Sequence, residues 1–450
     1  MNSLHQPIGP ATAILLLLTT SLLGCNDLNE ALNAEPKRRS GGVAGIASML
    51  GMLTFPALLP TFIEEWRLTN TDAGWLNGIY YAGYLAAVPV LVSLTDRAPT
   101  RRIYYLCLVL TTLVNAGFAL LAEGFWTALI FRAAAGIGFA GTFMPGLKLL
   151  VDHLKAMAGD KDQSRAVAFY TSSYGIGMAL SFYMAGVVET ALDWHWAFGL
   201  ATLGPAAAMA FVAALPREDP VPAEAPHTHL LDFRPVLRCR AAMGYVLAYT
   251  AHNFENFAFR SWIVTYLVFA AATGPGDGMA WSATTIVAVI NLLGMPASVL
   301  GNELSRCIGR HRAITIVMLS SAVLACVIGF SGNWPFWLVV ILASIYEVTV
   351  MGDSASITAG VVESAPEGYH GATMAVYSCI GFIGAFAGPL AFGVVLDLTS
   401  PSGIGGETVM SWGWAFAFTG LVATLGPLAL ALLGRSPVSS TTRIDADRRE

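Results

Sequence analysis

The chain has 450 residues, of which 55% are hydrophobic and 12% are charged. A soluble domain carries about 25% charged residues, so this composition excludes a water-soluble fold of such length. The formal net charge is −5 and no run of Lys and Arg exceeds three residues, which argues against a basic nucleic-acid-binding face. We therefore expect the lipid bilayer to surround most of the chain.

The apolar residues form twelve runs that are long enough to cross a bilayer core about 30 Å thick. Gly and Pro interrupt several runs, but helices buried in a membrane tolerate both residue types. The sequence therefore predicts an all-α membrane protein with twelve transmembrane helices, at 42–63, 74–93, 103–122, 126–152, 166–188, 195–215, 241–269, 281–304, 313–331, 335–363, 371–396 and 411–434.

The basic residues predict the orientation of these helices. Twenty of the 24 Lys and Arg residues fall on the side that also holds both termini, and Arg67 alone falls on the other side. Loops rich in Lys and Arg stay in the cytoplasm, so both termini are expected there, in a multi-pass protein of a bacterial inner membrane. The three remaining basic residues lie inside predicted helices, and they are Arg132, Lys148 and Arg260.

Residues 1–41 form an N-terminal extension outside the predicted bundle. An apolar run at 11–24 ends at Cys25 and resembles a lipoprotein cleavage site, but no Lys or Arg precedes it. Anchoring Cys25 outside would invert the orientation above. We interpret the extension as disordered or interfacial, or as the product of a start codon placed too far upstream.

Two segments of the chain repeat each other. Trp194-His-Trp-Ala-Phe and Trp412-Gly-Trp-Ala-Phe open the sixth and twelfth runs, and each precedes an identical Ala-Thr-Leu-Gly-Pro. An internal parallel repeat is typical of transporters that bind substrate between their halves near the membrane midplane. The predicted organisation has two pseudo-symmetric six-helix halves, 42–215 and 241–434, a cytoplasmic linker, 216–240, and a cytoplasmic tail, 435–450.

Three further motifs resemble those of the major facilitator superfamily. The loop after the second run reads Val-Ser-Leu-Thr-Asp-Arg-Ala-Pro-Thr-Arg-Arg over 92–102, close to the family's Gly-x-x-x-Asp-Arg-x-Gly-Arg-Arg. The loop at 301–312 keeps the glycines and bases but has Ser305 in place of the acid, and the fourth run contains Arg132-Ala-Ala-Ala-Gly136-Ile-Gly138. The resemblance implies the family's twelve-helix fold and transport by alternating access.

The resemblance also implies a cytoplasmic gate built from charged residues. For Asp152, a local ion pair with Lys148 four residues earlier is the alternative to a role in the gate. The residues assigned to the gate are Asp96, Arg97, Arg101, Arg102, Asp152, Arg306 and Arg310.

Charged residues within the predicted helices are the candidates for the transport site. A charge at the bilayer centre costs at least about 2.5 kcal/mol, so each needs a partner, a water-filled cavity or a function. The family resemblance implies that Arg132 couples protons or substrate to movement. In the tenth run we expect one of two acids, Glu347 or Asp353, to face the cavity, and we favour Glu347. The alternative for Asp353 is a pair with a base from another helix.

The seventh run carries an unusual set of polar residues. His252, Glu255 and Asn256 share one helix face, whereas Arg260 lies about 140° around from Glu255 and is expected to face another helix or an anionic substrate. Histidine titrates near neutral pH, and so does a carboxyl group that is shielded from water. We therefore expect this face to take up and release a proton.

The eleventh run contains small residues around a proline. Gly384, Gly388 and Pro389 predict a bend point or a close contact between helices.

These patterns predict a monomeric secondary transporter that moves a small organic solute, with protons as the coupled ion and without a cofactor or metal. An efflux pump or facilitator of the same fold is one alternative, and a membrane sensor or assembly factor that does not transport is another. An enzyme is not expected, because the sequence has no nucleophile and base set, metal cluster or phosphate loop.

Overall fold

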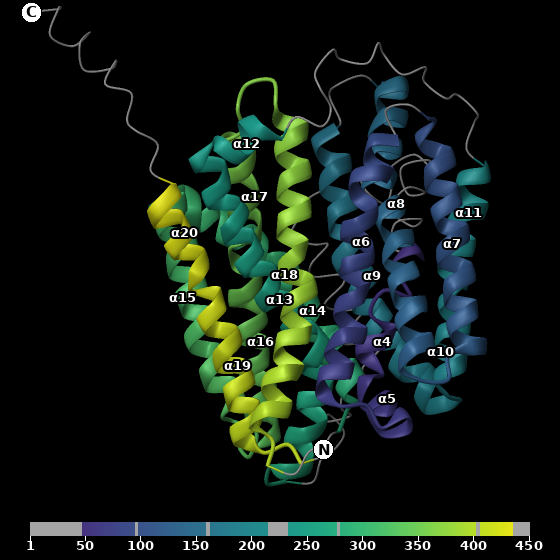
Figure 1. Cartoon of the computed structure of the whole chain (residues 1–450), viewed down its shortest axis with the longest axis vertical. Coiled ribbons are helices and arrows are strands. Elements are labelled where there is room, and N and C mark those ends of the chain that lie inside the picture. The colour runs from purple at the N-terminus through teal and green to yellow at the C-terminus, as the bar shows by residue number, and fades with distance from the viewer. Residues whose placement is uncertain are drawn as a thin grey trace, which may run out of the picture.

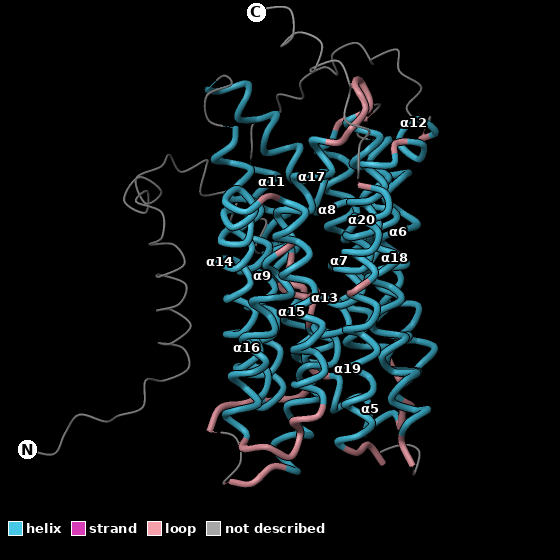
Figure 2. The backbone as a smooth tube through the Cα atoms, turned by 90° about the vertical axis from the view of Figure 1, so that its left-hand side faces the viewer, coloured by secondary structure: helices cyan, strands magenta, loops and turns pink. Residues whose placement is uncertain are grey.

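The computed structural model describes residues 47–94, 98–158, 163–214, 233–276, 280–401 and 406–434. Across these ranges the secondary structure is helical, and the helices run roughly along the long axis of the molecule (Figures 1 and 2). The N-terminal helices, purple to blue, occupy one side of Figure 1, and the C-terminal helices, green to yellow, occupy the other. The chain is therefore a bundle of two laterally placed groups of helices.

The N-terminal group agrees with the first six predicted runs except at its beginning and at the break within the sixth run. A continuous helix was expected at 42–63, but residues 49–53 form turns and a bend and two short helices follow, while 42–46 lie outside the described residues. The helices are α4 (Thr54–Ala57), α5 (Leu59–Trp66), α6 (Asn70–Leu94), α7 (Thr100–Leu121), α8 (Phe125–Ala158), α9 (Gln163–Ala191), α10 (Trp194–Ala201) and α11 (Leu203–Ala214).

The C-terminal group follows the last six predicted runs. The described end of the predicted linker is itself helical, as α12 (Arg234–Arg238), and the rest of the linker and the tail lie outside the described residues. The transmembrane helices are α13 (Arg240–Thr273), α14 (Ala283–Ile308), α15 (Arg310–Gly329), α16 (Phe336–Gly352), α17 (Ser354–Glu363), α18 (His370–Thr399), α19 (Val409–Ala423) and α20 (Leu425–Leu433).

The outer surface of the bundle is apolar, as a bilayer requires. Large apolar side chains such as Leu120, Ile130 and Leu398 are between 69% and 81% exposed. In water, a belt of such side chains would be unfavourable, whereas lipid solvates it. In the described part of the chain, seven stretches are long and apolar enough to span a membrane, and polar residues lower the hydropathy of others such as α13.

The repeated Ala-Thr-Leu-Gly-Pro motif has the same structural effect in both halves. Pro205 and Pro427 lack the N–H that would bond to the carbonyl four residues earlier. The helix breaks at that point each time, between α10 and α11 at Thr202 and between α19 and α20 at Thr424. Both Thr hydroxyls donate to the carbonyl three residues back, at 2.5 and 2.6 Å, so the repeat is one of structure as well as sequence.

Glycines bring the two halves into backbone contact along α6 and α18. These helices lie side by side at the centre of the bundle in Figure 1. A Cβ added at Gly74 or Gly78 of α6 would overlap the carbonyl oxygen of Pro389 or Phe386 of α18. A second seam joins α9 to α14, where Gly186 leaves room for Thr284.

The small residues predicted as a bend point or contact in α18 pack against α13. Added Cβ atoms at Gly384 and Gly388 would overlap the carbonyls of Thr250 and Phe254. The carbonyl of Pro389 accepts a hydrogen bond from the indole of Trp262 at 3.0 Å. The geometry is that of a close helix contact, and a hinge role stays a prediction.

The contact between α8 and α6 gives a direct test of this packing. A Cβ at Gly136 would overlap the carbonyl oxygen of Tyr80, so Gly136→Ala should destabilise the protein by about 1–3 kcal/mol and lower its apparent unfolding temperature in detergent. Gly199→Ala in α10 is the matched control, because nothing lies within 4 Å of its Cβ position. Equal unfolding temperatures for the two variants would contradict the packing described here.

Candidate transport site

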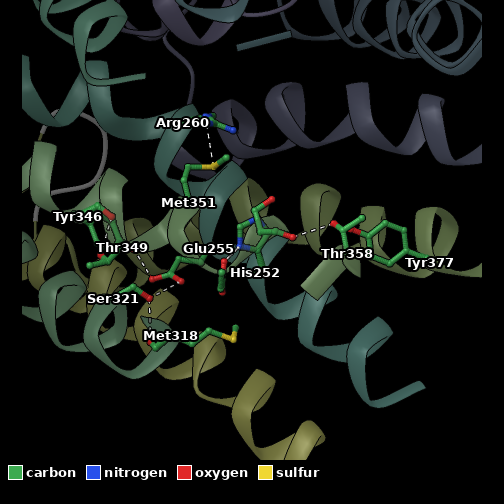
Figure 3. A network of polar contacts seen from close by, with 12 residues as sticks. His252, Glu255, Arg260, Met318, Ser321, Tyr346, Thr349, Met351, Thr358 and Tyr377 are labelled. Atoms are coloured by element: carbon green, nitrogen blue, oxygen red, sulfur yellow. Dashed lines mark hydrogen bonds and ion pairs between the residues drawn. The ribbon is translucent and has the colours of Figure 1, made fainter. Parts of the chain in front are cut away.

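A set of buried polar side chains extends along α13 into the C-terminal half. His252, Glu255, Asn256 and Arg260 are each at most 4% exposed, although Arg, His and Glu side chains usually remain at the surface. Figure 3 shows that Glu255 points toward Ser321 and Tyr346, and Arg260 toward Met351. The sequence therefore placed these residues correctly on a buried helix, and the structure supplies their partners.

Arg260 forms an ion pair in the interior of the bundle. Its guanidinium donates to Glu347 Oε1 of α16 at 2.9 Å, and its Nε donates to the amide oxygen of Asn291 of α14 at 2.9 Å. The amide nitrogen of Asn291 in turn donates to the carbonyl of Val287, which fixes its orientation. Arg260 thus faces neighbouring helices, one of the two orientations that the sequence allowed.

Glu255 lies between two hydroxyl groups rather than beside a cation. Tyr346 donates to Glu255 Oε1 at 2.9 Å, and the Ser321 hydroxyl lies 3.0 Å from Glu255 Oε2. The same Ser321 hydroxyl lies 3.0 Å from the carbonyl oxygen of Met318. Among the described residues, none forms an ion pair with this carboxyl group, which lies in a polar pocket formed by α15 and α16.

His252 contacts an acid that we did not favour. Its Nδ1 lies 2.7 Å from Asp353 Oδ1, with both residues buried, although the orientation is off the line of a hydrogen bond. Glu347 and Asp353 are both buried and face different partners. Which of the two faces a substrate cavity stays a prediction. Asp353 lies at the break between α16 and α17, where the chain bends away from a regular helix.

Several buried polar atoms in this region have no hydrogen-bond partner. They include Asn253 Nδ2, Asn256 Oδ1 and Glu347 Oε2. Buried polar groups are usually paired, so each of these atoms is a position where water or a ligand would be favourable.

Arg132 is buried in the N-terminal half and is held differently. Its Nε donates to the carbonyl of Leu76 at 3.1 Å, and its guanidinium lies 5.0 Å from the ring centre of Phe55 and 4.6 Å from that of Tyr80. Aromatic faces stabilise a buried cation, less strongly than a carboxylate does. Its predicted role in coupling stays a prediction.

The described part of the predicted cytoplasmic gate consists of contacts within each half. Arg101 donates to the carbonyls of Val212 and Ala213 near the end of α11, where the helix dipole favours a cation. Arg310 pairs with Glu363, which the sequence did not single out, through both guanidinium nitrogens.

The other gate residues are placed less informatively. Arg306 pairs with Glu303 three residues earlier, and Arg102 is exposed. An ion pair within one helix turn and an exposed arginine are both typical of a solvated surface. Asp96 and Arg97 lie outside the described residues, as does the side chain of Asp152.

Comparison with known proteins identifies the family. The model of the Major Facilitator Superfamily matches residues 41–389. The chain belongs to this superfamily. It is accordingly a multi-pass membrane protein with the twelve-helix fold of these transporters.

Relatives within the superfamily include transporters of several kinds. The chain is 25% identical to human protein spinster homolog 1 over 316 residues, a match that covers 65% of this chain and 57% of the human protein. It is 24% identical to the niacin transporter NiaP of Acinetobacter baylyi over 148 residues, covering 33% and 32% of the two chains.

Solved structures share the fold at low sequence identity. The nucleoside transporter NupG superposes with a TM-score of 0.67 at 13% identity, over 89% of this chain and 100% of that one. A bacterial homologue of the human lysosomal transporter spinster, in an inward-facing and occupied conformation, gives a TM-score of 0.65 at 15% identity, over 91% and 96%.

The buried pair of Arg260 and Glu347 predicts a specific pattern of stability. Arg260→Met should lower stability by about 3–5 kcal/mol, because it leaves the Glu347 charge buried and uncompensated. Adding Glu347→Met should restore most of the loss, since a pair of apolar residues of similar size needs no compensation. Thermal unfolding in detergent measures both changes, and a double variant less stable than Arg260→Met alone would contradict the ion pair.

Proposed function

We propose that the protein is a proton-coupled secondary transporter of a small organic solute and that Glu255 carries the proton. The observation that supports this most strongly is the environment of Glu255, a buried carboxyl group contacted by two hydroxyls and no cation. A carboxylate without a countercharge is costly in such a place, whereas a protonated carboxyl group is not.

The hydrogen count at this pocket favours the protonated form. Ser321 has one hydroxyl hydrogen but lies at hydrogen-bond distance from both the Met318 carbonyl and Glu255 Oε2. If Glu255 carries a proton on Oε2, it donates to Ser321, and Ser321 donates to Met318. Tyr346 donates to the other oxygen. Every donor and acceptor then has a partner, so we infer that this conformation is the proton-loaded one.

The Arg260–Glu347 ion pair and the contact of His252 with Asp353 flank Glu255 along α13 and offer a route for coupling. Arg260 binds Glu347 of α16, and His252 lies against Asp353 at the start of α17. Loss of the Glu255 proton would add a negative charge between these pairs and favour a rearrangement of α13 relative to α16. Such a rearrangement is the kind of two-state change that alternating access requires.

The substrate is expected to bind near α13, where buried polar atoms lack partners. Asn253, Asn256 and Glu347 contribute a donor and two acceptors. The names of relatives and neighbours provide a first panel for thermal-shift screening: niacin, nucleosides and a sphingolipid.

The proposed setting is a bacterial inner membrane with both termini in the cytoplasm, which the distribution of Lys and Arg supports. We further expect the protein to act as a monomer. A sensor of the same fold would share the ion pairs, but it would show no flux of any panel compound in proteoliposomes.

Glu255→Gln tests the proton site. Gln keeps the size of the side chain and cannot ionise, so the variant should exchange bound substrate across the membrane of proteoliposomes but fail to accumulate it against a gradient when a pH difference is imposed. Accumulation should fall at least about tenfold, measured with a panel compound that shifts the unfolding temperature.

The matched control is Glu303→Gln, at an exposed carboxylate outside the buried set. It should accumulate substrate as the unchanged chain does. Full accumulation by Glu255→Gln would refute the assignment of the proton, and uptake by the unchanged chain that ignores the pH difference would refute proton coupling itself.

A further inference from the structure

The N-terminus of α6 in one half is capped by a carboxylate from the other half. Asp397, near the end of α18, accepts hydrogen bonds from the backbone N–H of Asn70 at 3.1 Å and of Thr71 at 2.7 Å, one on each carboxylate oxygen. The side-chain amide of Asn70 donates to Asp397 at 3.0 Å and to Glu407 at 2.7 Å. The sequence does not indicate these contacts, because Asn70 lies more than 320 residues away from both Asp397 and Glu407.

The backbone of α6 depends on this contact. The first N–H groups of a helix have no partner within it. Locally, Thr69 supplies two partners, because its hydroxyl accepts from Asp72 N and its carbonyl accepts from Ala73 N. The remaining N–H groups, of Asn70 and Thr71, bond to the other half. Separating the halves at this point therefore uncaps the helix.

Glu407 is held in position by its own neighbours. Thr408 caps α19 through the backbone N–H of Ser411 at 3.2 Å, and the Ser411 hydroxyl donates to the carbonyl of Thr399 at the end of α18. The hydrogen bond from Ser411 to Thr399 thus joins the start of α19 to the end of α18, and both carboxylates contact Asn70 from this side.

The packing beside the cap is equally tight. A Cβ at Gly393 of α18 would overlap the carbonyl of Asn70, whose side chain is 4% exposed. Gly74, four residues after Asn70, packs against the carbonyl of Pro389, four residues before Gly393. Polar and backbone contacts together close the two halves at this end of the bundle.

At the opposite end of the bundle, two described charged contacts each join elements of the same half. Arg310 pairs with Glu363 in the C-terminal half, and Arg101 bonds to α11 in the N-terminal half. By the distribution of Lys and Arg, this opposite end is the cytoplasmic one.

We propose that Asp397, with Glu407, is the outer gate of this transporter: it closes the external side by capping α6 across the interface between the halves. The inference depends on the twelve-helix family fold and not on the substrate, the proton or Glu255. The gate can therefore be disproved while the proposed proton-coupled transport stands, and proton coupling can be disproved while the gate stands.

Distance measurements between the halves test the gate. Spin labels on Glu123→Cys, between α7 and α8, and Asn333→Cys, between α15 and α16, report the separation of two exposed external turns in a background with the native Cys residues replaced by Ser. Asp397→Ala should raise the ratio of open to closed external distances about two- to thirtyfold, the range that loss of a helix N-cap spans.

Asp193→Ala is the matched control. Asp193 caps α10 through the N–H of Trp196 at 3.1 Å, within one half. Asp193→Ala should remove the N-cap of α10 without changing the distribution of distances between the two spin labels. An equal change in both variants would overturn the proposal, because the effect would then be general destabilisation.

A second variant keeps the test decisive if Asp397→Ala does not fold. Asp397→Asn retains the side-chain size and one acceptor oxygen, so it should shift the distances in the same direction by a smaller factor. A folded variant of either kind whose distances match those of the unchanged chain would show that Asp397 is not the gate.

Discussion

The cost of removing ionisable groups from water is the constraint on which the interior of this protein depends. At the bilayer centre a charge is unfavourable by at least about 2.5 kcal/mol, and the structure meets this cost in three different ways. Arg260 is compensated by Glu347, Arg132 by a carbonyl and two aromatic rings, and Glu255 by hydroxyl groups that suit an uncharged carboxyl. Arg260 and Glu347 compensate each other's charge, whereas the surroundings of Glu255 suit a group without charge.

This difference explains why the proposed chemistry lies in the C-terminal half. Its interior holds two acids in contact with bases and a third, Glu255, which lies between two hydroxyl groups and which we propose carries the proton. The seams between the halves include backbone contacts at glycines, for example Gly74 against α18, and the polar contacts of Asn70 with Asp397 and Glu407. We propose that movement between the halves is controlled at these seams and that its coupling to a proton is controlled along α13.

The sequence was sufficient to predict the fold but only part of the site. Hydrophobic runs predict the helices, and the loop motifs and the Arg132 element resemble those of the family, since these are local properties. The helix breaks at Thr202 and Thr424 were not predicted, because each was assigned to one continuous run. The buried position of Glu255 is also visible in the sequence. The partnership of His252 with Asp353, and of Asn70 with Asp397, depends on how distant helices pack, and no local pattern encodes it. The first predicted helix is interrupted for a related reason: residues 49–53 are Met, Leu and Gly, which would also suit a helix, but they form turns and a bend.

The protonation state of Glu255 is the central claim, and infrared difference spectroscopy measures it most directly. The unchanged protein in lipid at neutral pH should show the carbonyl-stretch band of a protonated carboxyl group in an apolar environment, shifted by solvent deuterium. The same band should be missing from Glu255→Gln and retained in Glu303→Gln. Identical spectra in this region for the unchanged protein and Glu255→Gln would contradict the account.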